Sequence, residues 1–172
     1  FLNCGQICIA NERTYVHRKV ADQFIEKLLD RVKSMRVGNP LDEATQIGPK
    51  VNRVELDKVQ RTVSEALAQG AQAVVGGDIV ERTGSFAKGY WYQPTVLTGV
   101  RQDMAIMHQE IFGPVIPVMP FDDFEEGIAY ANDSHYGLAA YLFTNDMNRI
   151  MRAVRDLEVG ELYVNRGPGE SI

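Results

Sequence analysis

Residues 138–164, with the sequence LAAYLFTNDMNRIMRAVRDLEVGELYV, decide the fold class of this chain. Leu138–Phe143 has the short apolar composition of a strand, and Asp146 can cap a helix that follows it. Gly160 ends that helix, and Leu162–Val164 forms a second strand. The helix is predicted to bury one stripe, made of Met147, Ile150, Met151, Val154 and Leu157. Strands separated by single helices predict an α/β domain with a largely parallel twisted sheet flanked by helices.

The same alternation of strands and helices extends over the preceding residues. The predicted elements are a strand at 13–17, helices at 21–35 and 52–69, strands at 73–75 and 90–97, a short helix at 103–108, a strand at 115–121 and a helix ending near 132. Pro94, Pro117 and Pro120 place two of these strands nearer the edge of the sheet than its centre. Functional loops are expected at the carboxyl ends of the strands.

Length and charge narrow the class of protein. The chain has 172 residues, of which 45% are apolar and 24% charged, as in one ordinary globular domain. Its formal net charge is −5, with 18 basic residues that form no block, so we expect no nucleic-acid partner. No apolar run is long enough to span a membrane and no signal peptide is visible, so we expect no membrane partner. Two cysteines do not form a secreted framework, and the cytoplasm is the expected location.

The segment Asn3-Cys4-Gly5-Gln6-Ile7-Cys8 is the strongest local signal for chemistry. A thiol at the start of a helix would be acidified by free N–H groups and the helix dipole. Gly5 would let the backbone approach a ligand closely, and the Cys8 amide could donate to a developing oxyanion. The alternative is that each cysteine is a small buried apolar residue. A metal site is not predicted, because the C-x₃-C spacing would need further ligands and only three histidines exist.

A second signal lies at His108-Gln109-Glu110-Ile111-Phe112-Gly113-Pro114-Val115. Glu110 could accept hydrogen bonds from ribose hydroxyls while Phe112 covers a flat ring. The alternative is an ordinary corner between a helix and a strand, with Phe112 in the core.

Four segments together carry a resemblance to a known family. They are Gly5-Gln6-Ile7-Cys8, Gln109-Glu110-Ile111-Phe112-Gly113-Pro114-Val115, Asn132-Asp133-Ser134-His135-Tyr136-Gly137-Leu138, and Gly160-Glu161-Leu162-Tyr163-Val164-Asn165. In this order they resemble the G-Q-x-C, E-E-x-F-G-P-V, A-N-x-x-x-Y-G-L and G-x-x-x-x-N motifs of the aldehyde dehydrogenase superfamily. The resemblance covers essentially the whole chain. Residues 165–170 look closest to the lactaldehyde/glycolaldehyde dehydrogenase group.

The resemblance implies an NAD- or NADP-dependent oxidation of a small aldehyde to its acid. Cys8 would be the nucleophile that forms a thiohemiacetal and then a thioester, and its amide would supply half of the oxyanion hole. Glu110 would bind the nicotinamide-side ribose and Phe112 would pack near the nicotinamide. The residues expected to shape the substrate pocket are Phe1, Tyr163, Asn165, Arg166 and Glu170. Gln109 departs from the family motif, which has an acidic residue there.

The resemblance also implies that residues 1–172 are the catalytic, nucleophile-bearing domain of a longer enzyme. The NAD(P)-binding domain, with the general base, and the C-terminal oligomerisation segment would lie outside them. We therefore expect the isolated chain to be inactive and the full-length protein to be a homo-oligomer, either a dimer or a tetramer. Two alternatives stay open: a non-catalytic interaction or regulatory module that keeps the fold, and a thiol hydrolase that uses Cys8 and His108.

Overall fold

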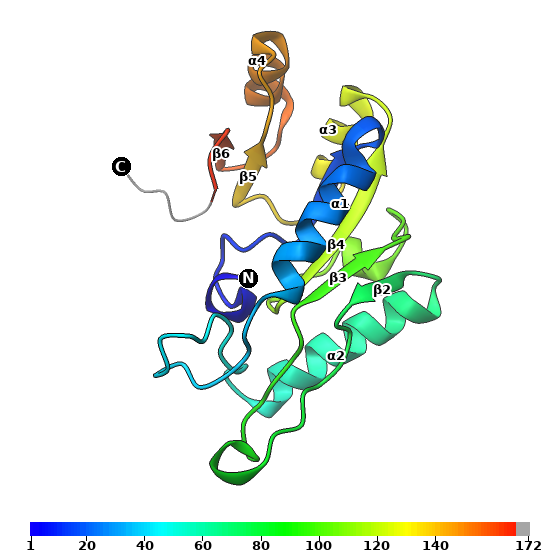
Figure 1. Cartoon of the computed structure of the whole chain (residues 1–172). Helices are drawn as coiled ribbons and strands as arrows, with labels where there is room; N and C mark the ends of the chain where they lie inside the picture. Colours follow the sequence, from blue (N-terminus) through cyan, green and yellow to red (C-terminus); the bar gives the residue numbers. More distant parts are fainter. Residues whose placement is uncertain (168–172) are drawn as a thin grey trace.

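The computed structural model describes residues 1–167, apart from the side chain of Ser85 (Figure 1). The strands are β1 (Thr14–His17), β2 (Gln72–Val75), β3 (Thr95–Thr98), β4 (Val115–Phe121), β5 (Ala139–Leu142) and β6 (Glu161–Val164). The α-helices are α1 (Arg18–Lys33), α2 (Arg53–Ala68), α3 (Phe124–Asn132) and α4 (Met147–Asp156). Three short turns complete the structure: η1 (Leu2–Gly5), which contains left-handed residues, and the 3₁₀ turns η2 (Gly84–Phe86) and η3 (Ala105–Met107).

The strands form a four-stranded sheet in the order β1-β4-β3-β2 and a two-stranded sheet of β5 and β6. The pairs β1–β4, β3–β4 and β5–β6 are parallel, and β2–β3 is antiparallel. The prediction of an α/β fold with a largely parallel sheet is therefore confirmed.

The prediction that β3 and β4 lie near an edge is wrong, because both strands are interior. The register explains how β4 accommodates Pro117. Its first half pairs with β3, where Pro117 is the last paired residue, and its second half pairs with β1 from Val118 onward. Pro117 thus lies where one ladder ends and the other begins, so its missing N–H interrupts neither ladder in the middle.

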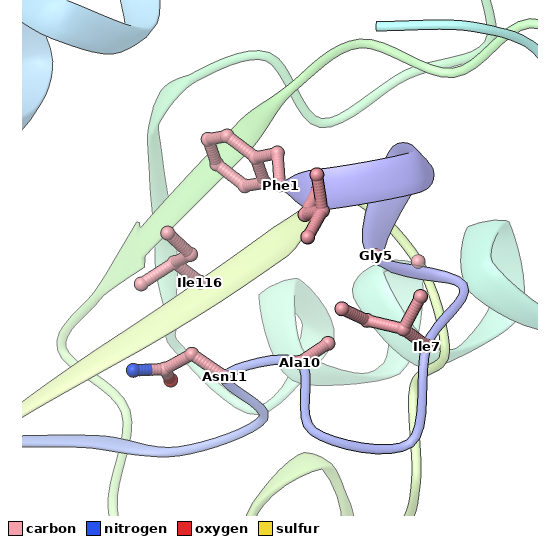
Figure 2. Close-up of a pocket in the computed structure, with 8 residues that line it drawn as sticks. Phe1, Gly5, Ile7, Ala10, Asn11 and Ile116 are labelled. Atoms are coloured by element: carbon pink, nitrogen blue, oxygen red, sulfur yellow. The ribbon is translucent and has the colours of Figure 1, made fainter. Parts of the chain in front are cut away.

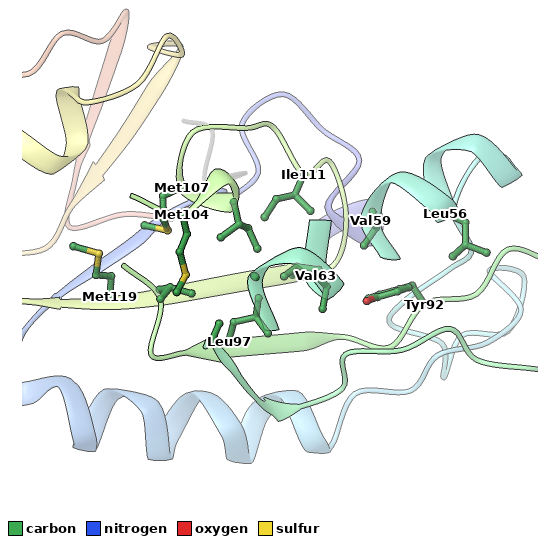
Figure 3. Packing of buried hydrophobic residues seen from close by; sticks show 14 residues of the cluster. Leu56, Val59, Val63, Tyr92, Leu97, Met104, Met107, Ile111 and Met119 are labelled. Atoms are coloured by element: carbon green, nitrogen blue, oxygen red, sulfur yellow. The ribbon is translucent and has the colours of Figure 1, made fainter. Parts of the chain in front are cut away.

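Two apolar clusters cover the two faces of the larger sheet. Alternate strand residues point to opposite faces, so Val96 belongs to one cluster and Leu97 to the other. Helix α2 covers the face with the larger cluster, to which it contributes Val59 and Val63 (Figure 3). Helix α1 contributes Ala21 and Val32 to the cluster on the opposite face.

The predicted helix starts at Asn52 and Asp146 are confirmed by side-chain caps, and Asp123 caps α3 in the same way, whereas α1 begins at Arg18, before its predicted start at residue 21. Asn52 accepts from the Glu55 N–H at 2.8 Å, Asp123 from the Glu126 N–H at 2.9 Å, and Asp146 from the Asn148 N–H at 2.9 Å.

The predicted buried stripe of α4 is wrong. Met147, Met151 and Val154 are 60–66% exposed, and the one fully buried residue of the helix is Ala153. The helix is rotated so that a small residue meets the neighbouring elements, and three large apolar side chains remain on the outer side. None of the helices in residues 1–167 is long and apolar enough to cross a membrane.

Candidate active site

The two segments that carried the chemical signals meet at the amino ends of β1 and β4. Cys8 precedes β1 and the segment 110–114 precedes β4, and these strands run parallel. A Cβ atom placed on Gly5 would lie 2.1 Å from the carbonyl oxygen of Gly113, so the two backbones are in direct contact. The expectation of functional loops at carboxyl ends is wrong for these two segments, because each loop enters its strand rather than leaves it.

Cys8 is exposed and lies in the turn formed by Ile7–Ala10, whose Ala10 N–H donates to Ile7 O at 3.0 Å. No helix begins at Cys8, so the expected position of this thiol at the start of a helix is wrong. Cys4 is different, because its side chain is 1% exposed and burial raises the pKa of its thiol to about 11. Cys8 is therefore the accessible thiol, and Cys4 is a neutral packing residue at physiological pH.

A run of left-handed backbone shapes the loop before Cys8. Asn3, Cys4 and Gly5 have φ values of 49°, 60° and 70°. The Gln6 side chain then fixes the loop, because it accepts from Val51 N–H at 2.8 Å and donates to Pro49 O at 3.2 Å. The segment 49–51 thereby becomes part of the surroundings of Cys8.

Glu12 is a site residue that sequence reasoning missed. Its carboxylate accepts from the N–H groups of Ile111 at 2.7 Å and Phe112 at 3.0 Å. Burial raises the pKa of Glu12, and these two donors act in the opposite direction. The only available signal was a carboxylate four positions after Cys8.

Lys50 is the second residue that was missed. It is 1% exposed, and its Nζ donates to the carbonyl oxygen of Phe112. Burial lowers the pKa of this ammonium group. Lysine is rarely buried without partners, and here a carbonyl oxygen accepts its hydrogen bond. The sequence shows only a lysine after Gly48-Pro49, with nothing to indicate its burial.

The two predicted cofactor residues lie on the segment that Glu12 and Lys50 hold. Glu110 is exposed, and its side chain has no hydrogen-bond or ion-pair partner among residues 1–167. Phe112 is half-buried and has a φ of 52°, which is uncommon for a bulky residue. The Nζ atoms of Lys50 and Lys58 lie 5.9 and 6.0 Å from its ring centroid.

Residues 3–10, which carry the predicted nucleophile Cys8, are called the nucleophile loop. The predicted pocket residues near β6 are linked to this loop through Tyr141, a further residue that was not anticipated. Tyr163 stacks on Tyr141 with 5.2 Å between ring centroids, and Tyr141 Oη donates to Ile9 O at 3.2 Å. The guanidinium carbon of Arg166 lies 5.2 Å from the centroid of the Tyr163 ring. The structure thus brings Tyr163 and Arg166 toward the loop that carries Cys8.

Asn165 joins the ends of β5 and β6. Its side-chain Nδ2 donates to Thr144 O at 2.9 Å, and its Oδ1 accepts from Thr144 N–H at 2.9 Å. Its φ of 54° fits a residue type that tolerates the left-handed region. This geometry agrees with the expected anchoring of loops.

Phe1 lines a small apolar cavity of about 90 Å³ behind the nucleophile loop (Figure 2). Gly5, Ile7, Gly113 and Ile116 also line it, whereas Cys8 does not. The structure therefore places Phe1 beside the contact between the two loops and not at the thiol.

Three remaining expectations concern Glu170, His108 and metals. Glu170 lies outside the described residues. His108 Nε2 lies 2.5 Å from Gln102 O and 4.0 Å from Asp133 Oδ2, so its contacts are with these residues and not with Cys8. Residues 1–167 contain no group of three or more His, Cys, Asp or Glu side chains that could hold a metal ion.

Comparisons with known proteins place this geometry in a family. Residues 1–172 match the aldehyde dehydrogenase family. A 3,6-anhydro-α-L-galactose dehydrogenase of Vibrio sp. (strain EJY3) is 50% identical over 170 residues, covering 99% of this chain and 35% of that protein. The lactaldehyde dehydrogenase of Escherichia coli (strain K12) is 42% identical over 166 residues, covering 96% of this chain and 34% of that protein.

Solved structures agree with the sequence comparisons. A 3,6-anhydro-L-galactose dehydrogenase in complex with NAP superposes with a TM-score of 0.93 at 50% identity, over 98% of this chain and 35% of that chain. Lactaldehyde dehydrogenase from Escherichia coli gives a TM-score of 0.92 at 42% identity, over 99% of this chain and 35% of that chain. The chain spans about a third of the length of these relatives. By its sequence match and its fold, the chain belongs to the aldehyde dehydrogenase family.

Proposed function

We propose that this chain is the nucleophile-bearing part of an NAD(P)⁺-dependent aldehyde dehydrogenase. One observation carries the proposal: the exposed Cys8 lies on a loop whose backbone touches the segment that bears Glu110 and Phe112. An accessible thiol is thereby held close to a carboxylate that has no partner among residues 1–167. This arrangement suits nucleophilic attack beside a bound nucleotide.

Cys8 is proposed to attack the carbonyl carbon of the aldehyde as a thiolate, forming a C–S bond and an oxyanion. The Cys8 N–H would donate to that oxygen. Loss of hydride from the substrate carbon leaves a thioester on Cys8. Water then attacks the thioester, which releases the carboxylic acid and restores the thiol. The balanced reaction consumes one aldehyde, one water and one oxidised nucleotide.

The residues present fit a nicotinamide nucleotide. Glu110 is an exposed carboxylate with no partner among residues 1–167, so it can accept from the two ribose hydroxyls. Phe112 offers a half-buried ring two positions away. When bound, the nucleotide would supply the hydride acceptor, and these two side chains would orient it.

The proposed substrate class is a small hydroxylated aldehyde, such as lactaldehyde or glycolaldehyde. Arg166 supports this class, because its Nε is buried and has no hydrogen-bond partner in the described part of the chain. A substrate hydroxyl or carboxylate oxygen would satisfy that donor. Two relatives are named for lactaldehyde and 3,6-anhydro-α-L-galactose, both of which carry hydroxyl groups.

The proposal includes a larger assembly. We propose that residues 1–172 are one domain of a cytoplasmic homo-oligomeric enzyme, a dimer or tetramer, and that they are inactive in isolation. Removal of a single oxyanion donor already lowers a rate by about 10²–10³. Sedimentation of the natural protein and assay of residues 1–172 alone test these two points.

Nucleotide reduction in the natural protein that carries this chain tests the activity. Wild-type protein is assayed with NAD⁺ or NADP⁺ and a panel of glycolaldehyde, lactaldehyde, betaine aldehyde and succinate semialdehyde. Cys8→Ser is expected to lower turnover by roughly 10³-fold or more, because a hydroxyl is a far weaker nucleophile. Cys4→Ala is the matched control and should keep most of the turnover, since Cys4 is buried.

Equal turnover in wild type and Cys8→Ser would exclude the proposed mechanism. A folded protein that binds nucleotide but oxidises no aldehyde would favour a non-catalytic module. Ester hydrolysis without nucleotide, lost in His108→Ala, would favour the thiol hydrolase.

A further inference from the structure

The segment Glu110–Gly113 adopts a backbone that needs outside support. Phe112 has a φ of 52°, in the left-handed region that bulky residues rarely occupy. Such conformations persist where the surrounding structure determines them. The contacts that hold this segment matter for function, since Glu110 and Phe112 are the residues proposed to bind the nucleotide.

Glu12 holds the segment from its N–H side. One carboxylate oxygen lies 2.7 Å from the Ile111 nitrogen and the other lies 3.0 Å from the Phe112 nitrogen. Hydrogen bonds to an ionised carboxylate are stronger than those between neutral groups. Two consecutive peptides are therefore oriented by one side chain, which lies four positions after Cys8.

Lys50 holds the same segment from its carbonyl side. Its Nζ donates to Phe112 O from a position that is 1% exposed. The lysine backbone is fixed in turn, because Lys50 N–H donates to Tyr90 O at 2.7 Å and the next N–H, of Val51, donates to the Gln6 side chain at 2.8 Å. Lys50 thus connects Phe112 to the residue that shapes the nucleophile loop.

We infer that Glu12 and Lys50 are positioning residues for the nucleotide. In this Glu12–Lys50 pair, the carboxylate of Glu12 accepts from the Phe112 N–H and the ammonium group of Lys50 donates to the Phe112 carbonyl oxygen. The pair thereby sets where Glu110 and Phe112 point relative to Cys8. The inference rests on the proposed function, and it predicts a loss of nucleotide affinity with little effect on the intrinsic reactivity of the thiol.

The experiment measures nucleotide affinity and thiol reactivity in the natural protein. Lys50→Met keeps the apolar stem and removes the donor. Glu12→Gln keeps the shape and removes the charge. Calorimetric titration with NAD⁺ and NADP⁺ is expected to show a Kd about tenfold higher in each variant for the nucleotide that wild type binds, which corresponds to about 1.4 kcal/mol. The rate of Cys8 alkylation without nucleotide should stay within about twofold of wild type.

Lys58→Met is the matched control. Its Nζ lies as close to the Phe112 ring as that of Lys50, at 6.0 against 5.9 Å, but it forms an ion pair with Glu55 at 3.3 Å and does not donate to the Phe112 carbonyl. The control should lose less nucleotide affinity than Lys50→Met, because it leaves the contact with the Phe112 carbonyl intact. A tenfold loss in Lys58→Met as well would assign the effect to charge near the ring and overturn the role of the carbonyl contact.

Steady-state kinetics separates positioning from chemistry. The KM for nucleotide should rise about tenfold in Lys50→Met and Glu12→Gln, while kcat at saturating nucleotide stays within about threefold. Wild-type affinity in both folded variants would overturn the inference while leaving the proposed function intact. A wild-type protein that bound neither nucleotide would overturn the proposed function and the inference together. If Glu12→Gln fails to fold, Lys50→Met decides alone, since it replaces a buried charge by an apolar group of similar shape.

Discussion

Cys4 and Cys8 lie four positions apart, yet the fold gives their thiols opposite environments. Cys4 is fully buried and its pKa is raised to about 11, whereas Cys8 is exposed. The motif alone could not separate them, because burial depends on the left-handed run at Asn3–Gly5 that turns one side chain inward. At the residue scale, the candidate nucleophile is thus selected by access and not by a helix dipole.

The raised pKa of Cys4 predicts a pH dependence of stability. The ordinary pKa of a cysteine thiol is 9.0, against about 11 for Cys4 in the fold, so the folded state holds its proton more tightly. The resulting stabilisation is full below pH 9 and declines as the pH rises toward 11, by about 2 kcal/mol. Urea unfolding of wild type and Cys4→Ala at several pH values measures it. The difference in unfolding free energy between them should shrink by that amount, and a constant difference would contradict the buried, neutral thiol.

Sequence reasoning identified Cys8, Glu110 and Phe112 as candidates but missed the side chains that hold them. The residue types of the motif, a thiol, a carboxylate and an aromatic ring, indicate the chemistry by themselves. Glu12, Lys50 and Tyr141 act through backbone groups far away in sequence, such as Phe112 O and Ile9 O. Such contacts depend on register and loop path, which no periodicity encodes.

At the scale of elements, the helices and their caps followed from local sequence, but their rotation and the place of each strand did not. Asn52, Asp123 and Asp146 cap the predicted helices because a cap needs only its own next three residues. Burial of α4 depends on what lies beside it, and Ala153 rather than Met151 faces inward. The interior place of β4 arises because its two halves pair with different strands, which its prolines alone do not reveal.

The contact between the nucleophile loop and the loop before β4 predicts that one methyl group added at Gly5 strongly lowers the free energy of unfolding. Gly5 has a φ of 70°, and a Cβ there would lie 2.1 Å from Gly113 O. Gly84 has a φ of 66° with nothing within 4 Å. Gly84→Ala should therefore cost only the left-handed strain, about 1 kcal/mol, whereas Gly5→Ala should cost at least about 3 kcal/mol because the backbones must also separate.

Denaturant unfolding of both glycine variants measures these costs. Gly5→Ala should also change the alkylation rate of Cys8, since the loop that carries the thiol must move. Equal destabilisation by the two variants would mean that the two loops separate at little energetic cost. The Gly5–Gly113 contact would then not fix Cys8 relative to Glu110 and Phe112, as the proposed function requires.

At the scale of the whole molecule, the unit β5–α4–β6 lies apart from the main sheet (Figure 1). Polar contacts join it to α3 and to the nucleophile loop. The Asn132 side chain donates to Asp156 O at 2.8 Å and accepts from Glu158 N–H at 3.0 Å, so it links α3 to the end of α4. Tyr141 links β5 to the nucleophile loop. The two apolar clusters of buried residues that stabilise the main sheet include no member of α4, β5 or β6. We therefore expect this unit to open at a lower free energy than the main sheet.

Asn132→Ala tests this division of stability. Loss of both hydrogen bonds leaves two backbone groups without their partner, which should lower the opening free energy of β5 and β6 by about 2 kcal/mol. Native-state hydrogen exchange should show faster exchange at Tyr141 and Tyr163 and unchanged exchange at Val63 on α2. Asn148→Ala, on the exposed side of α4, is the control and should change neither. If Val63 lost protection together with Tyr141, the sheet and the unit would open as one, and the contact of Tyr141 with the nucleophile loop would be as stable as the core itself.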